Sequence, residues 1–357
     1  MSTTVQVVVP PVAGHTRKPA TLKSEWRKRD PKTWTFAQRF FERADLWPLP
    51  PEGTAPVHKI NDPVPRLAQR QIHRFLVPKL LVTFGLHALI LKLIKKRALH
   101  PLAAFAFYSG AFKAINSRVF NFWRVLGAKH GFLDGEHERD GVPDGHESKV
   151  AQSLLFVTTI RPVLSTFLAY NTRDQPFSIS KLIPLKLSIY TVALDYWFYV
   201  YHRLMHEVDF LWKFHSRHHK TKHPSTALTL YADEWQELFD AVVIPGLAYL
   251  TTKQFISLNF YEFFVVMIYQ TFIELGGHSG VRCYATPPNA CFGLLRFFKM
   301  DLDIEAHDLH HRRGYKKSGN YGKQTLVWDT LFGTKMPRDE TRDEHIEWNQ
   351  HVDAPWY

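Results

Sequence analysis

The sequence predicts an all-α fold: an integral membrane helical bundle with a cytosol-facing, histidine-rich site for two metal ions. Three observations lead to this prediction. The chain contains long apolar segments, 14% of its 357 residues are aromatic, and histidines recur at helical spacing in its C-terminal half. Tryptophan and tyrosine gather at membrane interfaces, so an aromatic-rich chain is typical of a protein that contacts lipid. Mean hydropathy is slightly negative, so the membrane prediction depends on individual segments.

The clearest apolar segment runs from Phe75 to Leu93. Its middle contains no Asp, Glu, Lys or Arg, and Lys79 and Lys92 near its ends can extend their charged groups towards water. About 20 apolar residues are enough for a helix to cross a membrane, so this segment is predicted to span it. Pro78 falls in the first turn of the helix, where proline is tolerated.

The other apolar segments are shorter or contain polar residues, which a simple lipid-facing span avoids. Arg161 and Pro162 lie at the centre of one segment, and Asp195 lies inside another. We therefore expect interrupted helices that pack on one another and enter the bilayer in part. These segments cover residues 101–115, 151–170, 182–201, 238–252 and 255–273.

The chain is basic, with a formal net charge of +12. Such a balance suits nucleic acid or the anionic surface of a membrane. The sequence lacks zinc-finger spacing, a basic zipper and an RNP-like strand, so we expect a membrane partner and no nucleic acid. Neither Cys283 nor Cys291 belongs to a Cys-x-x-Cys pair, and the chain has no Asn-x-Ser/Thr acceptor site. Both features favour an active portion that faces the cytosol.

Nine histidines form the pattern that indicates chemistry. They belong to four segments, His-x3-His, His-x2-His-His, Gly-Gly-His-Ser-Gly and a second His-x2-His-His. Residues at i, i+3 and i+4 share one face of a helix, so each helix can offer two or three imidazoles to one point. The predicted metal ligands are His202, His206, His215, His218, His219, His278, His307, His310 and His311.

Chance and other metal sites explain this pattern poorly. About 0.06 copies of His-x2-His-His are expected from the histidine content, whereas the chain has two. The alternative is a set of surface or core histidines on amphipathic helices. One ion cannot use nine ligands, so at least two ions are implied, and imidazole suits Zn, Cu, Fe and Ni alike. Arg203 follows His202 where a zinc protease motif requires Glu.

Two further stretches accompany the histidines. Residues 195–199, Asp-Tyr-Trp-Phe-Tyr, run into His202-Arg203, and residues 320–322, Asn-Tyr-Gly, precede Trp-Asp-Thr-Leu-Phe-Gly-Thr at residues 328–334. Together with the histidine motifs, they make the chain resemble the fatty acid hydroxylase / sterol desaturase superfamily of integral membrane proteins. The resemblance covers residues 185–335.

The resemblance implies a multi-pass protein of the endoplasmic reticulum membrane whose metal site faces the cytosol. It also implies a di-iron centre, molecular oxygen, and electrons that come from NAD(P)H through a cytochrome b5-type donor protein. The implied substrate is a lipid or sterol-like molecule, fatty acyl and sphingoid types included, which is hydroxylated, desaturated or demethylated. Carried over to this chain, the iron ligands are the nine histidines given above.

The chain then divides into four regions. Residues 1–70 form an irregular, basic, proline-rich arm with one short helix expected around residues 34–44. The regions that follow are membrane-associated helices at residues 71–184, a fatty acid hydroxylase-like di-iron catalytic domain at residues 185–335, and a C-terminal tail at residues 336–357.

Two aspartates are predicted to orient ligand imidazoles, because a metal-bound histidine usually donates its other N–H to a carboxylate or a carbonyl. Asp195 lies two helical turns before His202, and Asp308 directly follows His307. The alternative for both is an aspartate on a helix surface that pairs with arginine or lysine.

The sequence departs from the superfamily at one position. Many members have a His-Pro pair after the second histidine cluster, where this chain has Asp233 and Glu234. Either carboxylate takes a similar place, or the position does not bind metal. His223 is not included among the ligands, because the Pro224 that follows it favours a loop.

Other functions remain open at this point. One is an oxygenase that tailors a hydrophobic natural product, such as a terpenoid or a polyketide. Another is a membrane metal-binding or zinc-storage protein, which would consume no oxygen. A catalytically silent scaffold is disfavoured because all histidine clusters are intact.

Overall fold

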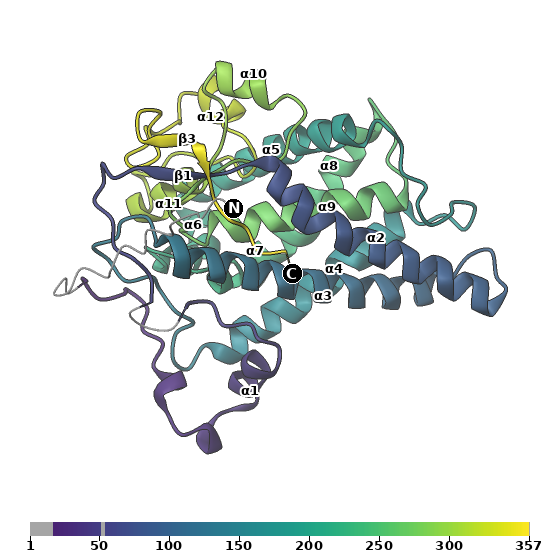
Figure 1. Cartoon of the computed structure of the whole chain (residues 1–357), viewed down its shortest axis with the longest axis horizontal. Coiled ribbons are helices and arrows are strands. Elements are labelled where there is room, and N and C mark those ends of the chain that lie inside the picture. Colours follow the sequence, from purple (N-terminus) through teal and green to yellow (C-terminus); the bar gives the residue numbers. More distant parts are fainter. Residues whose placement is uncertain (1–16, 51–53, 357) are drawn as a thin grey trace, which may run out of the picture.

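The structure is a computed structural model that describes residues 17–50 and 54–356. The beginning of the predicted arm, residues 1–16, and residues 51–53 and 357 lie outside the described residues. The described chain is mostly helical, as the sequence predicts (Figure 1). A small three-stranded sheet is present that the sequence does not predict.

Before the strand at Val64–Leu67, the described part of the arm contains two short 3-10 helices and one α-helix, which confirms the predicted short helix around residues 34–44. Its α-helix begins with a capping box: the Thr35 side chain accepts from the backbone N–H of Gln38, whose side chain accepts from the backbone N–H of Thr35. The elements are Trp26–Lys28, Pro31–Thr33 and α1, Phe36–Arg43.

Five long helices build the body of the molecule, and these are α2 (Gln69–Ile94), α3 (Pro101–His130), α4 (Glu147–Ala169), α5 (Ile183–Glu207) and α9 (Phe260–Gly277). Two of them, α2 and α4, are long and apolar enough to cross a membrane. Only 28% of the most apolar stretch of α2 is buried in the protein, compared with 44% for α4. Helix α2 therefore offers more of its apolar surface to the surroundings.

Arg161, the charge that interrupts the apolar segment of α4, turns into the protein. Its side chain is buried and pairs with Glu274 of α9, with 2.8 Å between the guanidinium and carboxylate atoms. A charge that is paired inside a helix bundle is compatible with a membrane helix, whereas one that faces lipid is not. The sequence pattern alone could not distinguish these two orientations.

Helix α9 forms the centre of the bundle. All of its residues are buried except Val265 and Gly277, and it packs against α2, α3, α4 and α5 (Figure 1). Gly276 allows the close approach of α3, because a Cβ atom there would lie 2.5 Å from the Trp123 ring. The Trp123 indole N–H donates to the carbonyl of Phe272 at 3.2 Å, which fixes the ring in this position.

The small sheet is parallel, and its strands are β1 (Val64–Leu67), β2 (Tyr284–Ala285) and β3 (Ile346–His351), in the order β2-β1-β3. Strand β1 leads directly into α2. The sheet therefore connects the beginning of α2, the chain after α9 and the C-terminal region. The predicted C-terminal tail contains a strand in its described part.

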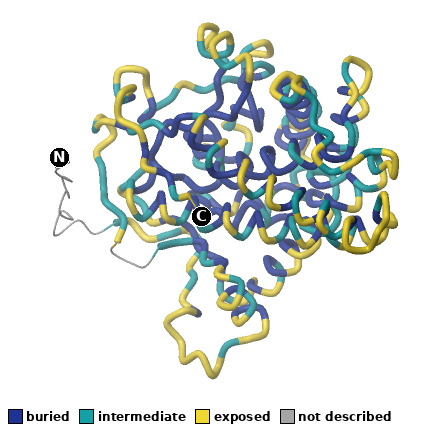
Figure 2. Tube along the Cα trace, turned by 45° about the vertical axis from the view of Figure 1, so that its right-hand side comes forward, coloured by how far each residue is buried: buried dark blue, intermediate teal, exposed yellow. Residues whose placement is uncertain are grey.

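The remaining elements are short and lie mainly between α5 and the C-terminal strand. Figure 2 shows that buried segments form a continuous centre, while exposed segments gather in the arm and in the connections between helices. The short elements are α6 (Asp209–His215), 3-10 helices His218–Lys220 and Thr226–Leu230, α7 (Glu234–Leu238), the π-helix Phe239–Val243, α8 (Ile244–Lys253), α10 (Phe292–Phe297), α11 (Ile304–Arg313) and α12 (Val327–Leu331).

Candidate metal centre

The nine predicted histidines lie together, and all nine side chains are buried. The C-terminal turns of α5 carry the His-x3-His motif, and α6 with the 3-10 helix after it carries the first His-x2-His-His motif. His278 lies at the end of α9, and α11 carries the second His-x2-His-His motif. Four separate segments therefore bring their imidazoles to one region of the fold.

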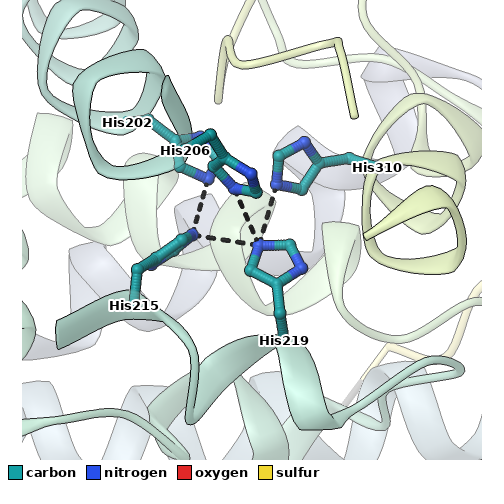
Figure 3. A group of neighbouring side chains, drawn as sticks. All are labelled: His202, His206, His215, His219 and His310. Atoms are coloured by element: carbon teal, nitrogen blue, oxygen red, sulfur yellow. Dashed lines mark hydrogen bonds between the residues drawn. The ribbon is translucent and has the colours of Figure 1, made fainter. Parts of the chain in front are cut away.

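The histidines divide into a group of five and a group of four. Within each group, the candidate ligand nitrogens all lie within 4.8 Å of one another. Figure 3 shows how the imidazoles of the larger group point towards one another from α5, α6, the 3-10 helix and α11. The five-histidine group is His202, His206, His215, His219 and His310, and the four-histidine group is His218, His278, His307 and His311.

Each His-His pair is divided between the two groups. His218 belongs to the four-histidine group and its neighbour His219 to the five-histidine group, and His311 and His310 divide in the same way. Successive residues of a helix point about 100° apart, so two neighbours can serve two adjacent sites. The expectation that all three imidazoles of each motif share one point is therefore wrong for one residue in each motif.

The distances between nitrogens fit metal ions better than hydrogen bonds alone. The Nε2 atom of His219 lies 3.0 Å from the Nε2 atoms of His206 and His215, and 3.1 Å from that of His310. One ring nitrogen has a single proton or lone pair and cannot bond to all three. Two nitrogens at about 2.1 Å from one ion and at right angles are about 3.0 Å apart. His311 Nε2 is buried and has no hydrogen-bond partner among the described residues.

The histidines are neutral at physiological pH, as metal binding requires. Burial lowers the pKa of His206 and of His278 to about 4. Burial also lowers the pKa of His219 well below its usual range, with a further contribution from the neighbouring histidines. Uncharged imidazoles can share this small buried volume without repelling one another.

Backbone carbonyls hold several of the imidazole rings at Nδ1, on the side away from the centre of the group. A loop after α11 accepts three of these hydrogen bonds from Nδ1 atoms: Tyr321 O lies 2.9 Å from His202, and Gly319 O lies 2.7 Å from His310. The carbonyl of Tyr315 lies 3.2 Å from His206 Nδ1. An N–H···O bond at Nδ1 leaves the Nε2 lone pair directed at the centre of the group.

Contrary to the sequence prediction, Asp195 does not contact a ligand imidazole but holds the loop that does. Its carboxylate accepts from the backbone N–H groups of Lys323 and Gln324, at 2.6 and 2.8 Å. Seven residues of helix separate it from His202, about 10 Å along the axis, so it does not reach that ring. It fixes the loop that supplies the Tyr321 carbonyl instead. Asp329, which sequence reasoning missed, accepts from the Tyr321 N–H in the same loop at 2.7 Å.

Asp308 does not contact an imidazole either. It is buried and pairs with Arg139 at 2.7 Å and with Arg312 at 2.9 Å. As the residue after His307 on α11, it points away from the metal groups. The alternative of an aspartate paired with arginine is the one observed, although the pair is buried and not on the surface.

The position where many superfamily members have His-Pro holds no ligand. Asp233 caps α7 by accepting from the Trp235 N–H at 3.1 Å, and Glu234 pairs with Lys149 at the surface. Gln236, further along α7, contributes instead: its Oε1 atom lies 3.0 Å from His215 Nδ1. Sequence reasoning missed Gln236, because the nearby carboxylates of Asp233 and Glu234 looked more suitable as partners of a metal site.

His223 belongs to a third, smaller group with Asp134 and His137. The Asp134 carboxylate lies 2.9 Å from His223 Nε2 and 3.1 Å from His137 Nδ1. Arg312 approaches the same carboxylate oxygen at 3.5 Å. The guanidinium already supplies positive charge there, so the group is explained as a cluster of ion pairs and hydrogen bonds.

Two openings approach the histidines. A polar cavity of about 490 Å³ opens to solvent beside His206 and is bordered by Lys316 and Lys335. A narrow, mainly apolar slot lies between α5 and α9, and its walls include Leu194, Ile273, Pro287, Pro288 and Gln324. Ile273 precedes His278 by five residues and Leu194 precedes His202 by eight, about one and a half and two turns of helix.

Comparisons with known proteins agree with the motif. The family model described as fatty acid hydroxylase matches residues 187–334. The fatty acid hydroxylase vlmA of Lecanicillium sp is 36% identical over 99% of this chain and 97% of its own length. Methylsterol monooxygenase 2-1 of Arabidopsis thaliana is 28% identical, over 44% of this chain and 58% of its own length. Sphinganine C4-monooxygenase 2 of the same plant is 25% identical, over 66% of this chain and 86% of its own length. No solved structure matches.

These matches confirm the resemblance drawn from the motifs. The matched family region begins within α5 and ends just after α12, so it contains all nine histidines and the loop that holds three of them. The relatives named above are hydroxylases and monooxygenases. The chain belongs to the fatty acid hydroxylase family and is an oxygen-dependent oxidoreductase.

Proposed function

We propose that the protein is a membrane-bound di-iron oxygenase that uses O₂ to hydroxylate, desaturate or demethylate a lipid. The observation that carries this proposal is the division of nine buried, neutral histidines into groups of five and four. Each group offers enough nitrogen donors for one ion, and imidazole suits iron. The names of the relatives support a fatty acyl, sterol or sphingoid type of substrate.

In this proposal, the five-histidine group holds one iron and the four-histidine group holds the other. When bound, the iron pair supplies the reduction of O₂ and the oxidation of a C–H bond. The protein fixes the ring orientations through Nδ1 hydrogen bonds and keeps bulk water away by burial. The slot between α5 and α9 has a free volume of only about 10 Å³ and would have to widen to position the alkyl part of the substrate.

The membrane arrangement is part of the same proposal. Helices α2 and α4 cross the bilayer of the endoplasmic reticulum, α3 and α9 pack against α4, and α9 also packs against α2. The histidines then face the cytosol, next to the polar cavity beside His206. Lys316, which pairs with Asp209, and Lys335 and Glu207 border that cavity, where an electron-donor protein of the cytochrome b5 type, supplied by NAD(P)H, would dock.

The proposed regions follow from this arrangement. Residues 185–335 form the catalytic domain, which the family match at residues 187–334 supports. Residues 71–184 supply membrane helices, residues 1–70 are the arm, whose helix α1 packs against α4, and residues 336–357 are the C-terminal region.

Metal analysis tests the proposal directly. Purified protein is expected to contain two iron ions per chain and to consume O₂ with an electron donor and a lipid substrate. His218→Ala and His310→Ala, one from each group, are expected to lose iron and turnover. His351→Ala, at an exposed position of β3, is a matched control that should retain both. Full turnover by a protein without bound metal would disprove the proposal.

Substrate identity is tested separately. Deletion of the gene is expected to make the unoxidised lipid accumulate, and lipid profiling of the deletion strain identifies it. Accumulation of a hydrophobic natural product instead would assign the enzyme to a tailoring reaction.

A further inference from the structure

Helix α10 has an unusual surface. Its six residues read Phe-Gly-Leu-Leu-Arg-Phe, yet none of them is buried. Leu294 is 60% exposed, Phe297 is 79% exposed, and the next residue, Phe298, is 54% exposed. A contiguous apolar surface on a folded protein marks a contact with another molecule or with a membrane.

The chain just before α10 is attached to the beginning of α2. The side-chain amide of Gln69, the first residue of α2, donates to Thr286 Oγ1 at 3.3 Å and to the Pro287 carbonyl at 3.1 Å. The Ala290 N–H donates to Ser188 Oγ of α5 at 2.9 Å. If α2 spans the bilayer, its first turn lies at the boundary between lipid tails and headgroups. These bonds hold α10 at that boundary.

The charges around α10 suit a headgroup layer. Arg296 lies within the helix, where it pairs with Asp343 at 2.7 Å and with Asp301 at 3.3 Å, and exposed Lys299 follows Phe298. The Lys335 ammonium donates to the Lys299 carbonyl, so a second lysine lies beside the same turn. Apolar side chains next to lysine and arginine are the composition of segments that lie in the plane of an anionic membrane surface. A docking site for a soluble acidic protein would not need three large exposed apolar side chains within five residues.

The slot between α5 and α9 opens under the same segment. Pro287 and Pro288, which precede α10, form part of its wall. Gln324 also lines the slot, and its side-chain Nε2 is buried and has no partner among the described residues. The segment that carries α10 therefore also forms part of the wall of this slot, whose free volume of about 10 Å³ has room for about one water, so an entering substrate would have to part these side chains.

We propose that α10 lies in the interface of the bilayer, with Leu294, Phe297 and Phe298 among the lipid tails and Lys299 among the phosphates. In this position, α10 holds the entrance of the slot against lipid, so an apolar substrate can enter from the bilayer without crossing water. The role in substrate entry rests on the proposed function, whereas the position of α10 in lipid does not.

A single thiol reports the depth of α10. Cys291 at its N-terminus is exposed and Cys283 is buried, so a bimane label on the folded full-length chain reports Cys291 alone. In vesicles of phosphatidylcholine and phosphatidylserine, we expect lipids with nitroxides on the tails to quench this label strongly. The control is C291S/E136C, which moves the thiol to the exposed loop before α4. Equal quenching by a water-soluble quencher at both positions, with none from lipid, would overturn the inference and indicate a protein partner instead.

Turnover tests the entry role. F297S/F298S is expected to raise the KM for a lipid presented in vesicles roughly fivefold or more, with iron content and maximal turnover retained. Phe36→Ser removes an exposed phenylalanine from α1 (84% exposed) and is the matched control with unchanged KM. An unchanged KM in F297S/F298S contradicts the entry role. If this variant loses iron, the depth measurement on Cys291 decides whether α10 lies in lipid. If the wild-type protein with two irons shows no turnover, the proposed function fails and the depth result still stands.

Discussion

At the scale of single residues, the metal centre depends on groups that never touch a metal. The carbonyls of Tyr321, Gly319 and Tyr315 hold three rings, and Asp195 and Asp329 hold the loop that presents the Tyr321 carbonyl. Each carboxylate accepts from backbone N–H groups of the loop, those of Lys323 and Gln324 for Asp195 and those of Tyr321 and Gly322 for Asp329. The loop is therefore kept in one conformation by two side chains from different helices.

Asp195→Asn should weaken the centre without removing a ligand. The amide keeps one acceptor oxygen but directs an NH₂ group towards backbone N–H donors, so the loop shifts and His202 loses its fixed acceptor. We expect iron affinity to fall roughly 10- to 100-fold. Metal titration measures this, and the visible spectrum of the Co²⁺-substituted protein should change, which a merely structural role would not require. Asp45→Asn, at an exposed ion pair with Arg124, is the control, and an unaltered spectrum for Asp195→Asn would contradict the role.

The same residues show how far the sequence could predict the site. Histidine spacing identified eight of the nine members, because ligand side chains recur on helix faces, whereas His278 stands alone in Gly-Gly-His-Ser-Gly and was included for its place between the last two motifs. It did not predict the division into five and four, which depends on how four segments meet in space. The carbonyl acceptors carry no side-chain signal, and Gln236 stands next to acidic residues that looked more suitable.

At the scale of elements, the central helix α9 is fixed by close approach to α3. The Gly276 Cα lies against the Trp123 ring, and two residues further on His278 enters the four-histidine group. The packing of this pair therefore sets where the end of α9 delivers its ligand. The hydropathy of the 255–273 segment predicted a helix here, but its burial by other helices required the tertiary structure.

Gly276→Ala tests this packing. A Cβ at 2.5 Å from the Trp123 ring forces one helix to move, and overpacking of this kind costs about 1–3 kcal/mol. We expect a lower thermal midpoint and loss of iron from the four-histidine group in particular. Gly110→Ala on α3 has no atom within 4 Å of its new Cβ and should behave like the wild type. Equal midpoints for both variants would show that α9 can shift at no cost.

At the scale of the whole molecule, the small sheet joins distant parts of the chain at one end of the helices. Val64, Tyr284 and Ile346, one from each strand, form a buried apolar cluster. Buried Arg282, just before β2, also pairs with Glu340 at 2.8 Å. The sequence did not predict this sheet, because strands of two to six residues show too few alternations to be recognised.

Removal of residues 345–357 should destabilise the whole bundle. It leaves β1 without β3 and exposes Val64 and Tyr284, which we expect to cost about 2–4 kcal/mol. Thermal unfolding of the purified protein measures the loss. The variant Ile346→Val keeps the strand and should show a much smaller change. An unchanged midpoint after truncation would mean that the sheet contributes little to stability.

The division of each His-His pair has a consequence for how this enzyme can evolve. Because His218 and His219 serve different groups, as do His310 and His311, a one-residue insertion or deletion within either motif would turn the later imidazoles by about 100°. Both groups would be damaged in one event. A change in the spacing inside either motif therefore cannot remove one metal site and keep the other. We expect the lengths of both motifs to be kept among functional relatives of this enzyme, whereas the lengths of the loops between them can vary.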